Sequence, residues 1–183
     1  MTARPALFRC IVVPLDFSDQ SQQALEYAVG LAQASKAEIV ALHVVEPVFF
    51  AGSGEAFGGG YDTRMVYDEL ERAAREELAV VSAALAKRRI AVRTLLRTGV
   101  AHEVIVAAAR RLKADLIVMS THGRTGLSHL VMGSVAERVV RGAACPVLTM
   151  HGAARAARAR TATSRRASDA GRRGRRATGG RAQ

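Results

Sequence analysis

The sequence has no tryptophan and few aromatic residues (4% of 183), although 49% of its residues are hydrophobic. The apolar mass is therefore largely aliphatic, and a chain of this length can bury one sizeable core as a single domain. No apolar run approaches the roughly 20 residues of a membrane-spanning helix, and Arg9 interrupts the first stretch before it could serve as a signal peptide. Two cysteines, Cys10 and Cys145, are too few for a disulfide framework or a metal site. We therefore expect a soluble, cytoplasmic protein.

Several standard catalytic motifs are also missing. A Walker A loop ends in Gly-Lys-Ser/Thr, but Lys36, Lys87 and Lys113 are the only lysines and none follows a glycine. His102-Glu103 has no second histidine four residues on, so it is not a zinc-protease pair. Neither G-x-S-x-G nor a G-x-G-x-x-G after a strand occurs. These absences exclude P-loop enzymes, this class of metalloprotease and hydrolases with a nucleophile elbow.

The basic charge is concentrated at the C-terminal end. Residues 151–183 hold ten arginines and one acid, Asp169, so they carry +9 of the chain's net charge of +11. After Met150 there is no Val, Leu, Ile, Phe or Tyr to offset the entropy of ordering. We expect a folded domain over 1–150 and a disordered tail over 151–183. This tail is either a nonspecific nucleic-acid anchor, without aromatic residues for base stacking, or a solvated extension.

Within residues 1–150, short apolar runs alternate with patterns of helical period. Strands are predicted at 11–13, 39–45, 90–96, 116–119 and 146–150. Helices are predicted around 19–32, opened by Ser18 and Asp19, and around 70–85, 104–112 and 135–139. The third strand alternates apolar and polar residues, which is typical of a sheet edge, and the glycines between 52 and 60 indicate a mobile loop. The alternation predicts an α/β fold, a parallel sheet with helices on both faces.

Ligands of open α/β sheets bind beyond the C-terminal ends of the strands, so the residues after the fourth strand are a candidate anion site. Gly123, Gly126 and Gly133 allow close approach and positive φ, and Ser120, Thr121 and Ser134 can donate hydroxyl hydrogen bonds. Ser134 followed by Glu137 is a capping-box pattern, which predicts a helix N-terminus that favours phosphate. An ordinary glycine-containing connection without a ligand remains the alternative.

Asp16 follows the first strand and is the second candidate. A carboxylate at this position can accept hydrogen bonds from ribose hydroxyls. The alternative is a helix N-cap, a role that Ser18 or Asp19 could equally take. His43 lies inside an apolar strand and is interpreted as a satisfied interior residue.

These residues resemble the universal stress protein family, whose signature is G-x-x-G, nine residues and then G-S/T. Gly123 fills the second glycine position, and Gly133 and Ser134 complete the motif after the nine spacers 124–132. Ser120 stands at the first glycine position, and serine tolerates positive φ less well than glycine. The resemblance extends over about residues 9–150 through these further segments: Val13–Ser18, Leu42–Val44, Thr98–Gly99 and Cys145–Val147.

The resemblance implies a Rossmann-like open sheet of five strands in the order 3-2-1-4-5, ATP binding with Mg or Mn, and a homodimer formed through the fifth strand. Asp16 would meet the ribose, Val44 would meet the adenine through its backbone, and the motif residues would hold the phosphates. The implied nucleotide-binding residues are Pro14, Leu15, Asp16, Val44, Met119, Ser120, Gly123, Gly133, Ser134 and Val135.

The resulting functional hypothesis is an ATP-binding stress-response protein whose nucleotide occupancy modulates its dimer or its partner interactions. No residue constellation supplies a general base or a Walker-type lysine, so at most slow hydrolysis is expected. One alternative is a nucleic-acid-associated stress protein anchored by the arginine-rich tail. An enzyme that adenylates a substrate is the third hypothesis and ranks last, because the chain is too short for the extra motifs and domain.

Overall fold

The computed structural model describes residues 7–46, 63–121 and 133–151 of the chain. Three features named in the sequence analysis lie outside the described residues: the glycine-rich loop at 52–60, the glycines Gly123 and Gly126, and the arginine-rich tail. The boundary at residue 150 and the disorder of the tail therefore stay predictions. The described elements all fall within the unit Met1–Met150.

Five strands and four helices alternate along the described residues. The strands are β1 (Cys10–Pro14), β2 (Glu38–Val45), β3 (Val92–Thr98), β4 (Leu116–Ser120) and β5 (Val147–Met150). The helices are α1 (Asp19–Ser35), α2 (Thr63–Lys87), α3 (Ala101–Arg111) and α4 (Ser134–Gly142). None of the described helices is long and apolar enough to span a bilayer. Each predicted strand and helix is present. The largest shift among the strands is at β3, which begins two residues later than expected, and among the helices at α2, which begins seven residues earlier.

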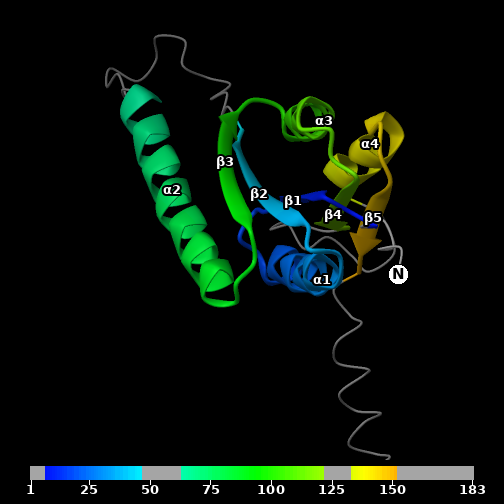
Figure 1. Cartoon of the computed structure of the whole chain (residues 1–183). Helices are drawn as coiled ribbons and strands as arrows, with labels where there is room; N and C mark the ends of the chain where they lie inside the picture. Colours follow the sequence, from blue (N-terminus) through cyan, green and yellow to red (C-terminus); the bar gives the residue numbers. More distant parts are fainter. Residues whose placement is uncertain (1–6, 47–62, 122–132, 152–183) are drawn as a thin grey trace, which may run out of the picture. The chain divides into compact units, whose positions relative to one another are not determined.

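The strands form one parallel sheet in the order β3-β2-β1-β4-β5 (Figure 1). Strand β1 is central: Val12 is aligned with Val40 of β2 on one side and with Ile117 of β4 on the other. The predicted α/β fold, its strand order and the edge position of β3 are confirmed. The strands β1, β2 and β3 follow one another toward one edge of the sheet, and β4 and β5 follow toward the other edge. The strand order therefore reverses between β1 and β4, which is the point where open α/β sheets bind their ligands.

The core has two layers, one on each face of the sheet. Figure 1 shows α3 and α4 together on one side of the sheet and α1 on the other, with α2 beside β3. On the α1 and α2 side, buried residues include Val13, Val29, Ile39, Leu85 and Val118. On the α3 and α4 side they include Val12, Leu42, Ile105, Ile117 and Val139. Strands β1 and β4 are thus covered on both faces, which explains their continuous apolar sequences.

Both cysteines pack as small hydrophobic residues. Cys10 and Cys145 are half-buried, unbridged and packed against the α3 and α4 layer. Burial raises the pKa of each thiol, chiefly by desolvation, so the reactive thiolate is disfavoured.

Asp115 ties the beginning of β4 to the beginning of β1. Its Oδ2 accepts hydrogen bonds from the backbone N–H groups of Arg9 at 2.8 Å and Cys10 at 2.9 Å, and its own N–H donates to the Cys10 carbonyl at 2.9 Å. The first two bonds, Arg9 foremost, lower the pKa of the Asp115 carboxyl from its ordinary value. The ionised carboxylate is therefore the form that stabilises the folded chain.

Replacing Asp115 with Asn is expected to lower the free energy of unfolding by about 1 kcal/mol at pH 7, since half-burial lets water screen the two bonds. Because the folded pKa is depressed, this difference should be complete above about pH 4, the usual pKa of a free aspartate. It should shrink as the pH falls through the lower folded pKa. Urea unfolding of both chains over this pH range measures it, with exposed Glu103→Gln as the control. A difference that is independent of pH contradicts the assignment.

Candidate functional site

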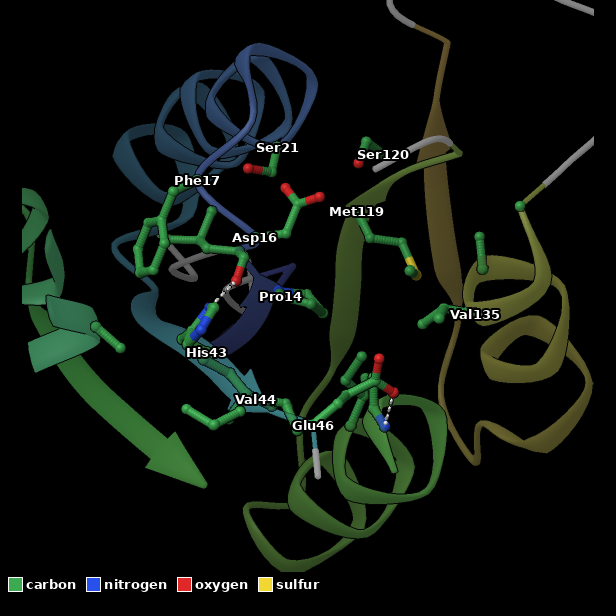
Figure 2. A pocket seen from close by; sticks show the side chains of 18 of the residues that line it. Pro14, Asp16, Phe17, Ser21, His43, Val44, Glu46, Met119, Ser120 and Val135 are labelled. Carbon is green, nitrogen blue, oxygen red and sulfur yellow. Dashed lines mark hydrogen bonds between the residues drawn. The ribbon is translucent and has the colours of Figure 1, made fainter. Parts of the chain in front are cut away.

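A cavity of about 630 Å³ opens at the C-terminal ends of β1, β2 and β4 (Figure 2). Its walls also include residues of α2, the first turns of α3 and α4, and the start of α1. The volume is within the usual range of small-molecule sites. The cavity lies where the strand order reverses, as expected for a ligand site in this fold.

The segment after β1 is fastened to β2 on one side of the cavity. Leu15 N–H donates to the Leu42 carbonyl at 2.8 Å, and the Leu15 carbonyl lies 2.6 Å from Nδ1 of His43. Phe17 stacks on the His43 ring with centroids 4.5 Å apart, although its φ of 64° is a backbone conformation that bulky residues rarely adopt. These contacts hold Asp16 between two fixed neighbours, and Figure 2 shows its carboxylate inside the cavity.

His43 has a hydrogen-bonding partner, as the sequence analysis predicted. It is nevertheless half-buried and lines the cavity, rather than being enclosed within the strand. Its role is to position the Leu15–Phe17 backbone, which the apolar surroundings of His43 in the sequence did not reveal.

Asp16 is not the N-cap of α1. The N-cap is Ser18, whose Oγ accepts a hydrogen bond from Ser21 N–H at 3.2 Å. Asp16 Oδ1 in turn accepts from the Ser18 N–H at 3.1 Å and from its hydroxyl at 2.6 Å. Of the two alternatives left open by the sequence, capping therefore belongs to Ser18, and Asp16 orients that cap from within the cavity.

Helix α3 receives its cap from a residue that the sequence analysis did not single out. Val100 occupies the N-cap position and makes no side-chain capping bond, and Glu46 Oε1 instead accepts a hydrogen bond from Ala101 N–H at 2.9 Å. Glu46 directly follows β2 and lines the cavity. The signal that could have identified it is the one used for Asp16, an acidic residue within two positions of the C-terminal end of a strand.

The capping box predicted for α4 is not formed, because the helix begins one residue earlier than expected. Gly133 is the N-cap, and Ser134 is the first residue of the helix. Glu137 forms an ion pair with Arg141 at 2.8 Å, one turn further on, instead of bonding back to the helix start. No side chain of the described residues caps this helix. Its N-terminus lines the cavity, as predicted, but with backbone groups only.

Two expectations about positive φ are also corrected. Gly133 has φ −60° and ψ 146°, an extended conformation open to any residue, so only its missing side chain distinguishes it. Ser120 is not among the residues with positive φ, and it ends β4 in regular strand. Serine at the first glycine position of the motif therefore causes no backbone strain.

Of the ten residues that the sequence analysis named, the described ones all line this cavity. They are Pro14, Leu15, Asp16, Val44, Met119, Ser120, Gly133, Ser134 and Val135, while Gly123 lies outside the described residues. The lining residues that the sequence analysis missed include Leu70, Ala73 and Glu77 of α2, Ala101 and Ile105 of α3, and Glu46 directly after β2.

Residues 7–151 match the profile of the Universal stress protein family. The chain belongs to this family. It is 37% identical over 144 residues to a universal stress protein of Methanocaldococcus jannaschii, a match that covers 79% of this chain and 82% of the relative. The family assignment made from the motif residues is thereby confirmed.

Solved universal stress proteins share its fold. A family member from Burkholderia pseudomallei superposes with a TM-score of 0.64 at 31% identity, covering 79% of this chain and 97% of that structure. A universal stress protein solved in complex with cAMP superposes with a TM-score of 0.50 at 25% identity, covering 79% and 97%.

Proposed function

We propose that this universal stress protein binds ATP at the cavity and that nucleotide occupancy modulates its dimer or its partner interactions. One observation carries the proposal. Residues at the N-termini of α1, α3 and α4 line the cavity. Asp16 supports the N-terminus of α1 by binding the capping residue Ser18, and Glu46 caps the N-terminus of α3 directly. Helix α4 alone among these three has no side-chain cap from the described residues. Its N–H groups and its positive dipole end favour phosphate oxygens.

The remaining walls suit the rest of the nucleotide. Asp16 would accept hydrogen bonds from the ribose hydroxyls, and the backbone of Val44 would meet the adenine. Gly133, Ser134 and Val135 would hold the phosphates, with Met119 and Ser120 beside them. The complex of a related family member with cAMP supports an adenine nucleotide as the ligand class.

A divalent cation is proposed to arrive with the nucleotide. Among the described residues, no three His, Cys, Asp or Glu side chains converge to form a metal site. Mg commonly binds through substrate phosphates and water with one or two protein oxygens, so the triphosphate itself would supply most of the ligands. Ser120 and Ser134 are hydroxyl donors or ligands available at that end of the cavity.

Rapid hydrolysis is not part of the proposal. The described residues at the α4 end of the cavity supply the hydroxyl groups of Ser120 and Ser134 and the backbone N–H groups of Ser134 and Val135, and the Asp16 carboxylate is engaged by Ser18 and proposed to meet the ribose. A general base must lie within hydrogen-bonding reach of the attacking water. We therefore propose a regulatory binding site with at most slow turnover.

Strand β5 is the proposed dimer contact. It is an edge strand paired on one side with β4, and its four residues are half-buried. Thr121 N–H donates to the Met150 carbonyl at 2.9 Å, and Gly133 N–H donates to the Thr121 carbonyl at 2.8 Å. This chain of bonds joins the α4 N-terminus to the end of β5, which offers a physical route from phosphate to the edge strand.

Calorimetric titration of Mg-ATP into the full chain tests the proposal. We expect saturable one-to-one binding at micromolar affinity. The chain shortened after Gly152 is the control, because ten arginines bind triphosphate nonspecifically and with steep salt dependence. Binding that disappears with the tail, or no heat at near-millimolar ATP, would falsify the nucleotide assignment.

The nucleic-acid role of the tail stays a separate prediction, because these residues lie outside the described part of the chain. Its basis is the charge of +9 over residues 151–183. A gel-shift comparison of the full chain with the chain ending at Gly152 tests it, and equal weak binding by both removes the idea.

A further inference from the structure

The carboxylate of Glu46 has two oxygens in different situations. Oε1 accepts the hydrogen bond from Ala101 N–H at 2.9 Å and so closes the N-terminus of α3. Figure 2 shows the second oxygen pointing into the cavity. Since one oxygen is engaged by the helix, the carboxylate is held in place while its other oxygen faces the space where a ligand would lie.

The surroundings of Glu46 on this side of the cavity are apolar. Alternate residues of a strand share one face, and Val40, Leu42 and Val44 of β2 all pack with the α3 and α4 layer. Glu46 directly follows β2 and is exposed, and Ile105 and Met119, both buried, line the cavity with it. Glu46 thus places a hydrogen-bond acceptor at the end of an apolar wall suited to a flat base.

The other two carboxylates that line the cavity are placed differently. Asp16 belongs to the segment after β1 and orients the Ser18 hydroxyl, and Glu77 lies on α2, where it is exposed, as Glu46 is after β2. Among the described lining residues, Glu46 is therefore the carboxylate that belongs to the β2 and α3 wall, and β1 separates β2 from β4 in the sheet.

We infer that Glu46 determines base specificity at this site by accepting a hydrogen bond from the exocyclic amino group of a 6-aminopurine. The inference rests on the proposed nucleotide function and deepens it. Val44 and Glu46 are two residues apart, roughly 6–7 Å along an extended strand, so a base that meets the Val44 backbone extends toward Glu46. A 6-oxopurine presents a carbonyl oxygen to the same carboxylate, where two acceptors repel each other and the polar atoms are left unpaired.

The test compares Mg-ATP with Mg-ITP on the full chain. These nucleotides differ at the 6-position, amino against oxo, and at N1, which carries a proton only in ITP, so the change caused by substituting Glu46 is what assigns the 6-position contact. The arginine-rich tail does not distinguish the two bases, so both titrations use the same salt concentration and tail binding is fitted as a separate component common to both triphosphates. We expect wild-type protein to bind ATP about tenfold more tightly than ITP, the usual effect of one hydrogen bond to a charged group. Glu46→Gln should reduce this ratio to threefold or less, on the order expected when a donor faces the 6-oxo group.

The glutamine variant also separates recognition from a purely structural role. Its carbonyl oxygen still accepts from Ala101 N–H, so the midpoint of urea unfolding should fall only by the loss of the charge at the α3 N-terminus and by less than in Glu46→Ala. Glu46→Ala removes the acceptor altogether and should also reduce the ratio of the ITP and ATP dissociation constants. Glu77→Gln is the matched control, because it removes the same charge from the same cavity at another wall and should leave the ratio unchanged.

An unchanged ratio in Glu46→Gln, or an equal narrowing in Glu77→Gln, overturns the inference while ATP binding by the wild-type chain still supports the proposed function. A wild-type chain that binds neither nucleotide overturns the proposed function, and this inference with it. A wild-type chain that binds ATP and ITP equally overturns the inference alone.

Discussion

Replacing Gly133 with Val is expected to weaken Mg-ATP binding by at least about 100-fold, which corresponds to roughly 2.7 kcal/mol of binding free energy. Gly133 is the N-cap of α4 at φ −60° and ψ 146°, a conformation in which valine is comfortable. The β-branched side chain would then occupy the space in front of the first N–H groups of α4, where the phosphates are proposed to lie. Calorimetric titration measures the change.

The fold should survive this substitution. Val100 already occupies the N-cap of α3 with a similar backbone, φ −73° and ψ 119°, so a valine at such a position is tolerated in this chain. Valine is a poorer N-cap than glycine, and we expect a cost of about 1 kcal/mol in stability. Glu137→Gln is the control on the same helix, because Glu137 pairs with Arg141 and does not line the cavity. A folded Gly133→Val chain with wild-type affinity rules out this phosphate site.

Replacing Ile117 with Ala should cause the largest loss of stability, about 3–5 kcal/mol. Ile117 lies in β4 with none of its surface exposed, aligned with Val12 of β1 and Val147 of β5. It packs in the layer beneath α3 and α4, where the flanking strands and helices prevent the void left by the smaller side chain from closing. A loss of this size removes much of the total stability of an ordinary domain.

Urea unfolding at pH 7 measures this loss, with Val140→Ala as the matched control. Val140 is on α4 and 46% exposed, so its truncation should change the free energy of unfolding by no more than about 0.5 kcal/mol. Equal effects of the two substitutions would show that the α3 and α4 layer is not packed around Ile117 as described.

Burial was easier to predict from the sequence than pairing. The apolar runs of β1, β2 and β4 placed these strands to within about one residue, since strands covered on both faces have nearly continuous hydrophobic sequences. Strand β3 shows the limit. Ile90 was predicted to start it, and Ile90 is buried, but its N–H donates to the Leu85 carbonyl at the end of α2 and the ladder begins at Val92. A hydrophobic pattern predicts which side chains are buried, but it does not predict which backbone groups form hydrogen bonds with one another.

The cavity could be predicted as a set of residues but not as a network of hydrogen bonds. Parallel strands end at one edge of the sheet, so Asp16 and Ser120 had to lie near each other once the strand order was known. The partner of each carboxylate could not be derived in the same way. Glu137 is suitably spaced to interact with either Ser134 or Arg141. Glu46 accepts its hydrogen bond from Ala101, which lies 55 residues later in the chain. Such choices depend on side-chain geometry that spacing alone does not determine.

The missing side-chain cap of α4 has a thermodynamic consequence. A bound phosphate would complete the first turn of this helix from outside the chain, so part of the folded structure would be supplied by the ligand. Ligand affinity and resistance to unfolding are then linked: saturating nucleotide should protect the amides of α4 from hydrogen exchange more than those of α1, which carries its own cap at Ser18. The stability of α4 would thus depend on the nucleotide concentration in the cell.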